Sequence, residues 1–183
     1  VLDVATGSGS LLQQANEQTD GSRLMGVEIQ PLVAKLARKL LNESESTEIV
    51  NQDFFDWRLS AQQELSGASQ NEASEKFDAV IGDPPMGRPF HLDAEVRERI
   101  QEWAPGRGKS TSAAFVIKAV SHLKEGGRGA FLLPKSALKD GLLEQLAETC
   151  GIHRIVELPV GPLNHAHSVE LVLLTLIKED RSR

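Results

Sequence analysis

A rigid acidic corner interrupts the chain at Asp83, which follows an apolar run and precedes two prolines. Proline has a fixed φ and no backbone N–H to give to a sheet, so residues 77–82 are predicted to form a strand that stops there. The carboxylate of Asp83 and the carbonyl groups of Pro84 and Pro85 therefore lie on stiff backbone. Such a corner suits a reaction that needs hydrogen-bond acceptors in fixed places. The same residues could also serve only to end a strand.

Three other predicted strand ends carry residues that could bind a nucleoside. Gly7 and Gly9 lie in a tight turn between a strand and a helix, where a ligand can approach the backbone closely. Glu28 ends the second strand, where a carboxylate can accept hydrogen bonds from ribose hydroxyls. Asp53 ends the third strand. Each acid alone could be an ordinary solvated strand end, but together with the glycine turn they predict a nucleoside pocket beside Asp83.

Other nucleotide or metal sites are disfavoured by the sequence. A dinucleotide-binding turn would carry a third glycine where this chain has Leu12. The stretch PGRGKST is similar to a phosphate-binding loop, but Trp103 occupies the first glycine position and no strand precedes it. His165 and His167 have no carboxylate or cysteine nearby, so they are interpreted as surface residues. No metal site is predicted.

The elements that position these residues alternate between strand-like and helix-like segments. Alternation of this kind predicts a doubly wound, mostly parallel α/β sheet that is covered on both faces. Ligands bind beyond the C-terminal strand ends of such a sheet, which is where the residues above lie. Gly126, Gly127 and Gly151 are expected to end two of the helices. The predicted strands are 1–5, 23–29, 47–53, 76–83, 128–134, 153–159 and 169–177, and the predicted helices are 11–18, 31–43, 112–124 and 137–150.

Length and composition favour one globular domain over residues 1–183. The chain is 40% hydrophobic and 25% charged, and its net charge of −6 argues against a broad basic face that wraps nucleic acid. A lone cysteine, Cys150, cannot form an internal disulfide, which favours a reducing, cytoplasmic setting. The longest apolar run is too short to span a bilayer, so no membrane role is expected.

Two segments do not follow the alternation. Residues 57–76 are rich in Ser, Gln, Glu and Asn and are interpreted as a surface insertion. Residues 86–110 follow the Asp83 corner, hold Gly, Pro and Arg, and form a candidate lid over the target site. The chain opens directly on a strand at Val1, without Met, and is therefore interpreted as a fragment of a longer protein.

Four motifs, in order at consecutive strand ends, resemble those of class I S-adenosylmethionine-dependent methyltransferases that act on amino groups. The motifs are DVATGSGSLL, GVEIQP, NQDFFD and DPPM. Within that class the chain is most similar to the N6-adenine DNA methyltransferases, in particular the methylation subunit of type I restriction-modification systems. The resemblance covers nearly the whole chain, and it implies a seven-stranded, Rossmann-like sheet whose last strand is antiparallel.

The resemblance implies S-adenosylmethionine as cofactor and a role for each matching residue. Glu28 would hold the ribose, Ile29 would pack on the adenine of the cofactor, and Asp53 with Phe54 would hold its amino edge. Phe54 is equally typical of a core position. The catalytic corner would be Asp83, Pro84, Pro85 and Met86, and the methionine part of the cofactor would be lined by Asp3, Ala5, Thr6, Gly7, Ser8 and Gly9.

An exocyclic amine is a poor nucleophile because its lone pair is delocalised into the ring. Two acceptors aimed at its two N–H bonds, the Asp83 carboxylate and the Pro84 carbonyl, would draw that pair out of conjugation. The family usually has an aromatic residue after the prolines, which stacks on a flipped base, whereas this chain has Met86. The lost stacking corresponds to a rate lower by on the order of tenfold. Phe90 or Trp103 could substitute.

The expected reaction is methyl transfer to the N6 amine of adenine in DNA. No segment resembles a base-reading helix, so target recognition is expected from a specificity domain or subunit elsewhere. Two alternatives remain open. The first is a methyltransferase that acts on another planar nitrogen, such as an RNA base or a protein glutamine amide. The second is an inactive protein that keeps the fold for binding or assembly.

Overall fold

The computed structural model describes residues 1–19, 21–42, 46–57, 76–87, 94–103, 110–159 and 169–179. The strands are β1 (Leu2–Asp3), β2 (Leu24–Glu28), β3 (Thr47–Asn51), β4 (Phe77–Gly82), β5 (Leu123–Pro134), β6 (Cys150–Glu157) and β7 (Leu171–Lys178). The helices are α1 (Ser10–Gln18), α2 (Pro31–Leu40), α3 (Ala94–Trp103), α4 (Thr111–Ser121) and α5 (Leu143–Ala147), with a π-helical turn η3 (Leu138–Leu142).

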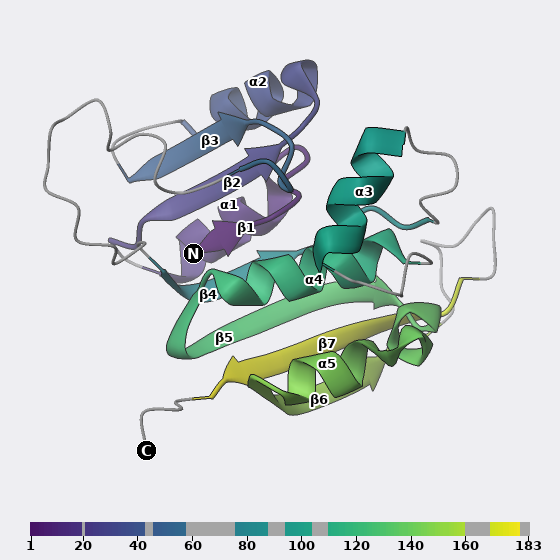
Figure 1. Ribbon diagram of the computed structural model, residues 1–183. Coiled ribbons are helices and arrows are strands. Elements are labelled where there is room, and N and C mark those ends of the chain that lie inside the picture. The colour runs from purple at the N-terminus through teal and green to yellow at the C-terminus, as the bar shows by residue number, and fades with distance from the viewer. Residues whose placement is uncertain are drawn as a thin grey trace, which may run out of the picture.

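One seven-stranded sheet joins these strands in the order β3-β2-β1-β4-β5-β7-β6 (Figure 1). Strands β1 to β5 pair in parallel, whereas β7 is antiparallel to both β5 and β6. The predicted doubly wound, mostly parallel sheet with a last antiparallel strand is therefore confirmed. The chain winds away in two directions from β1 and β4, so the topological switch point lies between these neighbouring strands.

Apolar side chains cover both faces of the sheet, as expected for parallel strands. Every residue of β2 is buried. One core cluster joins α1 and α2 to β2 and β3, and includes Leu12, Ala37 and Ile49. A larger cluster on the other face includes Val116 of α4 and Phe131 of β5. The two clusters enclose the sheet and leave its C-terminal strand edge for the site.

Helix α4 is the most deeply buried helix near that edge. Ser110 caps its N-terminus, where the hydroxyl accepts a hydrogen bond from the Ala113 N–H at 3.3 Å. Small residues such as Ala113 and Ala114 let the helix pack closely, and it contacts β5, α3 and η3. Figure 1 shows α4 lying in front of the sheet with α3 next to it.

The glycine pair after α4 does not end that helix as predicted. Helix α4 ends at Ser121, and β5 already begins at Leu123. Phe77 pairs with Leu123, but Ala79 pairs with Arg128, so the residues between are bulged out of the ladder. Gly126 has φ +76, and a Cβ on Gly127 would lie 2.8 Å from the Lys124 carbonyl oxygen. The two glycines therefore make a strand bulge, where their lack of a side chain is required.

The helix predicted over 137–150 is also divided. Gly141, with φ +72, lies inside the π-helical turn η3, and α5 follows it only as far as Ala147. Cys150 and Gly151 belong to β6 and do not end a helix. A positive φ at Gly141 interrupts the regular α-helical ladder, which the apolar periodicity of the sequence did not reveal.

Several predicted features lie wholly or partly outside the described residues. These are most of the 57–76 insertion, His165 and His167, Phe90, and the parts of the 86–110 segment that flank α3. The division into one domain with an insertion and a lid therefore stays a prediction. Within the described parts of the chain, no helix is long and apolar enough to cross a membrane.

Candidate functional site

The candidate site lies at the switch point, where β1 and β4 end next to each other. Asp3 is the last residue of β1 and pairs with Ile81 of β4, two residues before Asp83. The chain turns away from the sheet after both strand ends, which leaves the space between them open to a ligand. The loop after β1 and the corner after β4 are thus brought to one place, as the sequence predicted.

Asp3 is the most deeply buried acid of the site. Its side chain is 0% exposed, and Oδ1 accepts a hydrogen bond from the Ala5 N–H at 3.2 Å. No hydrogen-bond partner for Oδ2 lies among the described residues. The pKa of Asp3 is raised to about 7, chiefly by burial and also by the negative charges of Asp83 and Glu28, while the Ala5 hydrogen bond acts in the opposite direction. A buried carboxylate oxygen without a partner is a place where a cationic or hydrogen-donating ligand fits.

The turn after Asp3 runs close over β2. The Thr6 N–H donates to the Val27 carbonyl at 3.0 Å, and the Thr6 hydroxyl donates to the Asp3 carbonyl at 3.2 Å. A Cβ on Gly26 would lie 2.2 Å from Thr6 Oγ1, so only glycine permits this approach. Gly7 has φ +56, and a Cβ there would meet nothing within 4 Å. The space beside the Gly7 Cα is therefore not filled by any neighbouring atom, and a contact of Gly7 with a ligand stays a prediction.

Glu28 holds the same turn from the end of β2. Its Oε2 accepts a hydrogen bond from the Gly7 N–H at 2.9 Å, and its Oε1 accepts one from the Gln30 N–H at 2.7 Å. The side chain is 9% exposed. Asn51 holds the following backbone by donating to the carbonyls of Glu28 and Ile29 at 2.8 and 3.0 Å. The sequence predicted that Glu28 lies at this strand end. It did not reveal the bond of Glu28 to Gly7 or the bonds of Asn51 to the two carbonyls.

The other predicted residues of this pocket differ in exposure. Ile29 is 61% exposed, so its side chain is open to a ligand. Gly9 is buried, and a Cβ there would lie 2.7 Å from Leu41 of the α2 C-terminus. Ser8 is exposed, and its hydroxyl shares a hydrogen bond with that of Ser10 at 3.1 Å. Gly9 therefore serves close packing of the turn, while Ile29 and Ser8 lie at its surface.

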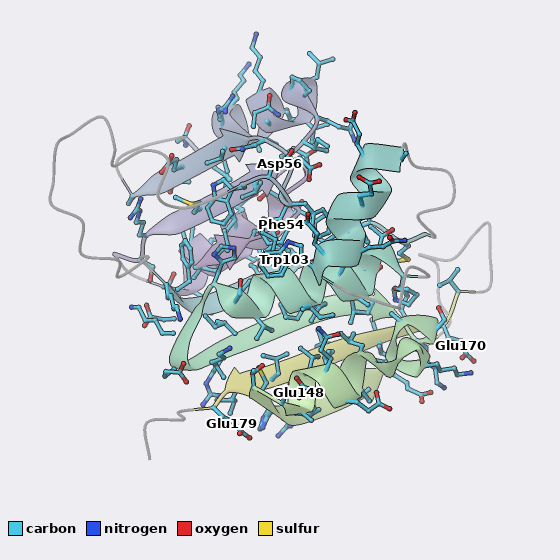
Figure 2. The ribbon with its side chains drawn as sticks, viewed as in Figure 1. Phe54, Asp56, Trp103, Glu148, Glu170 and Glu179 are labelled. Carbon is cyan, nitrogen blue, oxygen red and sulfur yellow. The ribbon has the colours of Figure 1, made fainter. Side chains whose placement is uncertain are left out.

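Asp53 begins a tight turn after β3. Its Oδ1 accepts a hydrogen bond from the Phe55 N–H at 2.9 Å, and its carbonyl accepts one from the Trp57 N–H at 2.9 Å. Phe54 is 2% exposed and its ring stacks on Phe115 at 5.4 Å between centroids. The side chain of Phe54, labelled in Figure 2, therefore belongs to the core.

The corner formed by Asp83, Pro84 and Pro85 lies at the surface and is held by a hydrogen bond from α4. Asp83 is exposed and Pro84 is buried. Partial burial raises the pKa of Asp83 above its usual value. The Ser112 hydroxyl donates to the Pro85 carbonyl at 3.0 Å, so the second proline carbonyl is already engaged. Met86, which follows Pro85, is 46% exposed.

Two residues that the sequence reasoning missed are Lys118 and Ser112, both on α4. Lys118 is the only charged residue in the apolar segment AAFVIKAV, a pattern that marks a buried ion with a specific partner. Its ammonium group donates to carbonyls of the Asp53 turn. Ser112 gave no such signal. In the parts of the chain that are described, no cluster of residues suits a metal ion.

Sequence comparisons place the chain among known methylases. The model of the family described as N-6 DNA Methylase matches residues 1–183. Type II methyltransferase M.CvrRI of Paramecium bursaria Chlorella virus XZ-6E is 32% identical over 143 residues, 75% of this chain and 31% of that protein. The tRNA1(Val) (adenine(37)-N6)-methyltransferase of Porphyromonas gingivalis is 25% identical over 142 residues, 76% of this chain and 51% of that protein. The chain thus spans a third to a half of these relatives.

Solved structures share the fold. A protein of Listeria monocytogenes assigned as a class I S-adenosylmethionine-dependent methyltransferase superposes with a TM-score of 0.72 and 22% identity, over 100% of this chain and 54% of that one. A protein of Vibrio vulnificus YJ016 assigned as the modification subunit of a type I restriction enzyme gives a TM-score of 0.69 and 20% identity, over 97% of this chain and 40% of that one. At these identities the likeness establishes the class I methyltransferase fold.

Proposed function

Because the chain belongs to the N-6 DNA methylase family, we propose that it transfers a methyl group from S-adenosylmethionine to the exocyclic N6 amine of adenine in DNA. The observation that carries the proposal is the juxtaposition of the buried carboxylates of Asp3 and Glu28, which belong to the predicted pocket, with the Asp83–Pro84 corner at one switch point. The pocket suits a cationic cofactor, and the corner supplies two acceptors for an amine.

The charge of the pocket supports S-adenosylmethionine over a dinucleotide. Asp3, Glu28 and Asp83 are close enough for the charges of the last two to raise the pKa of the first. S-adenosylmethionine, when bound, supplies an electrophilic methyl group on a cationic sulfonium, and it also carries an ammonium group. A pyrophosphate would bring further negative charge into the same pocket, which costs free energy. Asp3 Oδ2, which no described residue partners, would accept from the cationic end of the cofactor.

The remaining cofactor contacts follow from the exposure of each residue. Glu28 would accept from the ribose hydroxyls with the lone pairs that Gly7 and Gln30 leave. Ile29 would pack on the adenine ring, and Asp53 with the Phe54 backbone would hold the amino edge. Ala5, Thr6, Ser8 and Gly9 shape the turn around the methionine part.

Asp83 and Pro84 would activate the target amine. The Asp83 carboxylate and the Pro84 carbonyl would each accept a hydrogen bond from one N–H group of the amine, which turns the nitrogen lone pair away from the ring. The new N–C bond forms as the S–C bond breaks, and the electron pair of that bond stays on sulfur. The amine nitrogen then carries one proton too many, and Asp83 accepts it directly or passes it to water. A carboxylate with a raised pKa suits that step.

Met86 would contact the flipped base in place of the usual aromatic residue. Aromatic stacking contributes about 1–3 kcal/mol per base, and sulfur–ring contact recovers part of it. Met86 is exposed at the corner, as a base contact requires. Trp103 is a poor substitute because its ring packs against the core and lies 5.4 Å from Lys118 Nζ.

RNA is the second candidate acceptor, and one observation favours it. The Porphyromonas gingivalis relative named above acts on adenine in a tRNA, and it matches a larger share of its own length than the viral relative does. DNA is the first proposal because the family model that matches residues 1–183 is described as N-6 DNA Methylase. The same acceptor pair would also suit a protein glutamine amide, and loss of activity with retention of the fold is the remaining alternative.

Sequence recognition would come from elsewhere, because the chain matches only part of its relatives. We propose a specificity domain or subunit as the partner. The setting would be cytoplasmic, in a restriction-modification system.

The proposal is tested by calorimetric titration of the chain with S-adenosylmethionine, with NAD as the matched control. We expect micromolar-range binding of S-adenosylmethionine and none of NAD. Binding of NAD alone, or of neither compound to a folded chain, would refute the proposed cofactor. Mass spectrometry of DNA, RNA and protein after incubation with labelled cofactor then identifies the acceptor.

A further inference from the structure

A lysine is buried in the middle of α4. Lys118 is 2% exposed, and its ammonium group donates hydrogen bonds to the carbonyls of Phe54, of Phe55 at 2.9 Å and of Trp57 at 3.0 Å. The same nitrogen lies 4.8 Å from the ring centre of Phe54 and 5.4 Å from that of Trp103. Figure 2 shows Phe54 and Trp103 together near α3 and α4. Burial of an ammonium group is costly unless its donors are satisfied, and here three backbone carbonyls accept from it.

Lys118 and Asp53 both form hydrogen bonds with the same turn. Asp53 accepts the N–H groups that open the turn, through Oδ1 from Phe55 and through its carbonyl from Trp57. Lys118 donates to carbonyl groups of the same turn, those of Phe55 and Trp57. A shift of the Lys118 ammonium group would therefore move the turn, and with it the Asp53 carboxylate proposed to bind the cofactor adenine.

The first turn of α4 holds the reaction corner in the same way. Ser112 is 0% exposed, and its hydroxyl donates to the Pro85 carbonyl at 3.0 Å. The backbone N–H of Thr111 donates to the Gly87 carbonyl at 3.4 Å. These two bonds lie directly beyond Asp83 and Pro84 and fix the backbone on which the two acceptors are carried. The Ser112 hydroxyl and the Lys118 ammonium group both donate to backbone carbonyls, so we assign them a positioning role.

We propose that α4 sets the position of the turn that begins at Asp53 relative to the corner formed by Asp83 and Pro84. Lys118 and Ser112 are the two positioning residues. The inference rests on the proposed methyl transfer. Lys118 follows Ser112 by six positions, which corresponds to about 9 Å along a rigid α-helix. Methyl transfer needs the amine nitrogen and the methyl carbon aligned at about 3–3.5 Å, and a misplacement of about 1 Å can lower the rate on the order of 10²-fold. One buried helix bonded to both loops provides that alignment.

The test compares substitutions at the two ends of α4. Lys118→Met keeps the apolar stem and removes the donors, and we expect it to weaken S-adenosylmethionine binding about tenfold, one charged hydrogen-bond equivalent. Lys118→Arg keeps donors and charge, and we expect it to recover part of the affinity. The matched control is Lys124→Met, which removes an exposed lysine paired with Asp78 at 2.9 Å and leaves binding unchanged. Calorimetry measures the affinity of each variant.

Ser112→Ala is expected to act on the other half of the site. It should lower kcat about tenfold or more while leaving the dissociation constant of S-adenosylmethionine unchanged. Ser121→Ala is the matched control, because the Ser121 hydroxyl donates to the Lys118 carbonyl within the last turn of the same helix and should leave kcat unchanged. A split of this kind, with affinity lost at Lys118 and kcat lost at Ser112, is not produced by general destabilisation.

Tryptophan fluorescence gives an independent readout of the turn. The chain has two tryptophans and no tyrosine, and both Trp57 and Trp103 lie beside Lys118. We expect the emission of Lys118→Met to differ from wild type before any ligand is added, and that of Lys124→Met to match it. Thermal unfolding checks that each variant is folded. If Lys118→Met does not fold, the test uses the S-adenosylmethionine affinity of Lys118→Arg and the kcat of Ser112→Ala.

The outcomes separate this inference from the proposed function. A wild-type chain that binds no S-adenosylmethionine refutes the proposed function and the inference together. Wild-type binding with the same affinity in a folded Lys118→Met variant refutes the inference and leaves the proposed function standing. An equal loss of affinity in both the Ser112 and the Lys118 variants would also contradict it, because the two ends of α4 would then act on one element.

Discussion

Replacing Asp3 by Asn tests the acidic pocket before any cofactor is added. Asp3 is fully buried, and its pKa is raised from 3.8 to about 7, chiefly by burial. A shift of about three units corresponds to about 4 kcal/mol, at about 1.4 kcal/mol per unit. Below the unfolded pKa near 3.8 the group is protonated in both states and costs nothing. Between about pH 4 and about pH 7 the unfolded state releases the proton while the folded state keeps it. The free energy of unfolding therefore falls as pH rises through this range.

The expected result is a pH-dependent gain in stability for Asp3→Asn. The variant should differ little from wild type near pH 4, become more stable as pH rises, and reach a constant advantage of up to about 4 kcal/mol above pH 7. Urea unfolding of both proteins across this range measures the difference. Burial and the nearby Lys118 charge lower the pKa of His122 to about 4, which adds a pH dependence of opposite sign in both proteins. Subtracting the wild-type free energy of unfolding from that of the variant removes this shared term.

The control and the ligand complete this test. Asp78→Asn changes an exposed acid whose bond to Lys124 lowers its pKa, so its titration lies below the window and the slope should not change. In wild type, affinity for S-adenosylmethionine should rise about tenfold per pH unit up to about 7, because the cation favours ionised Asp3, and this rise should vanish in Asp3→Asn. A stability difference that is constant with pH would refute the assignment of the raised pKa to Asp3.

Three further substitutions test the remaining roles. Asp83→Ala should lower kcat on the order of 10²-fold to 10³-fold, the effect of one oriented hydrogen-bonding group, with unchanged cofactor affinity in calorimetry; normal turnover would remove its role. Asp53→Ala should weaken S-adenosylmethionine binding about tenfold or more, and an unchanged dissociation constant would move the adenine pocket elsewhere. Met86→Phe should lower the KM for the nucleic acid about tenfold through stacking, and an unchanged or higher KM would show that residue 86 does not contact the base.

The fold and the family were predictable from the sequence because their signals are local. Glycines, acids and prolines stand at consecutive strand ends, and the alternation of apolar patterns orders those strands. The family match over residues 1–183 confirms the resemblance read from four motifs. The parallel sheet and the antiparallel β7 are confirmed as well. The assignment of individual site residues stays a prediction, since the structure places them without testing what they bind.

The misses came from tertiary contacts that no local pattern encodes. Gly126 and Gly127 look like a helix end, but β5 starts earlier and uses them for a bulge against β4. Phe54 stands at a strand end, where the sequence favours a core position and a cofactor contact equally, and only the structure shows that its ring packs on Phe115. The bond between Ser112 and Pro85 joins residues 27 apart in the chain, and its sequence context is ordinary. Such contacts depend on how helices pack on the sheet.

The most direct test of the account is methyl transfer itself. The chain is incubated with isotopically labelled S-adenosylmethionine and duplex DNA, and the digested nucleosides are separated by mass spectrometry, with tRNA as the parallel substrate and Asp83→Ala as the control protein. The account predicts labelled N6-methyladenine in DNA with wild type and none with Asp83→Ala. Label in tRNA but not in DNA, or label in DNA that survives the loss of Asp83, would contradict it.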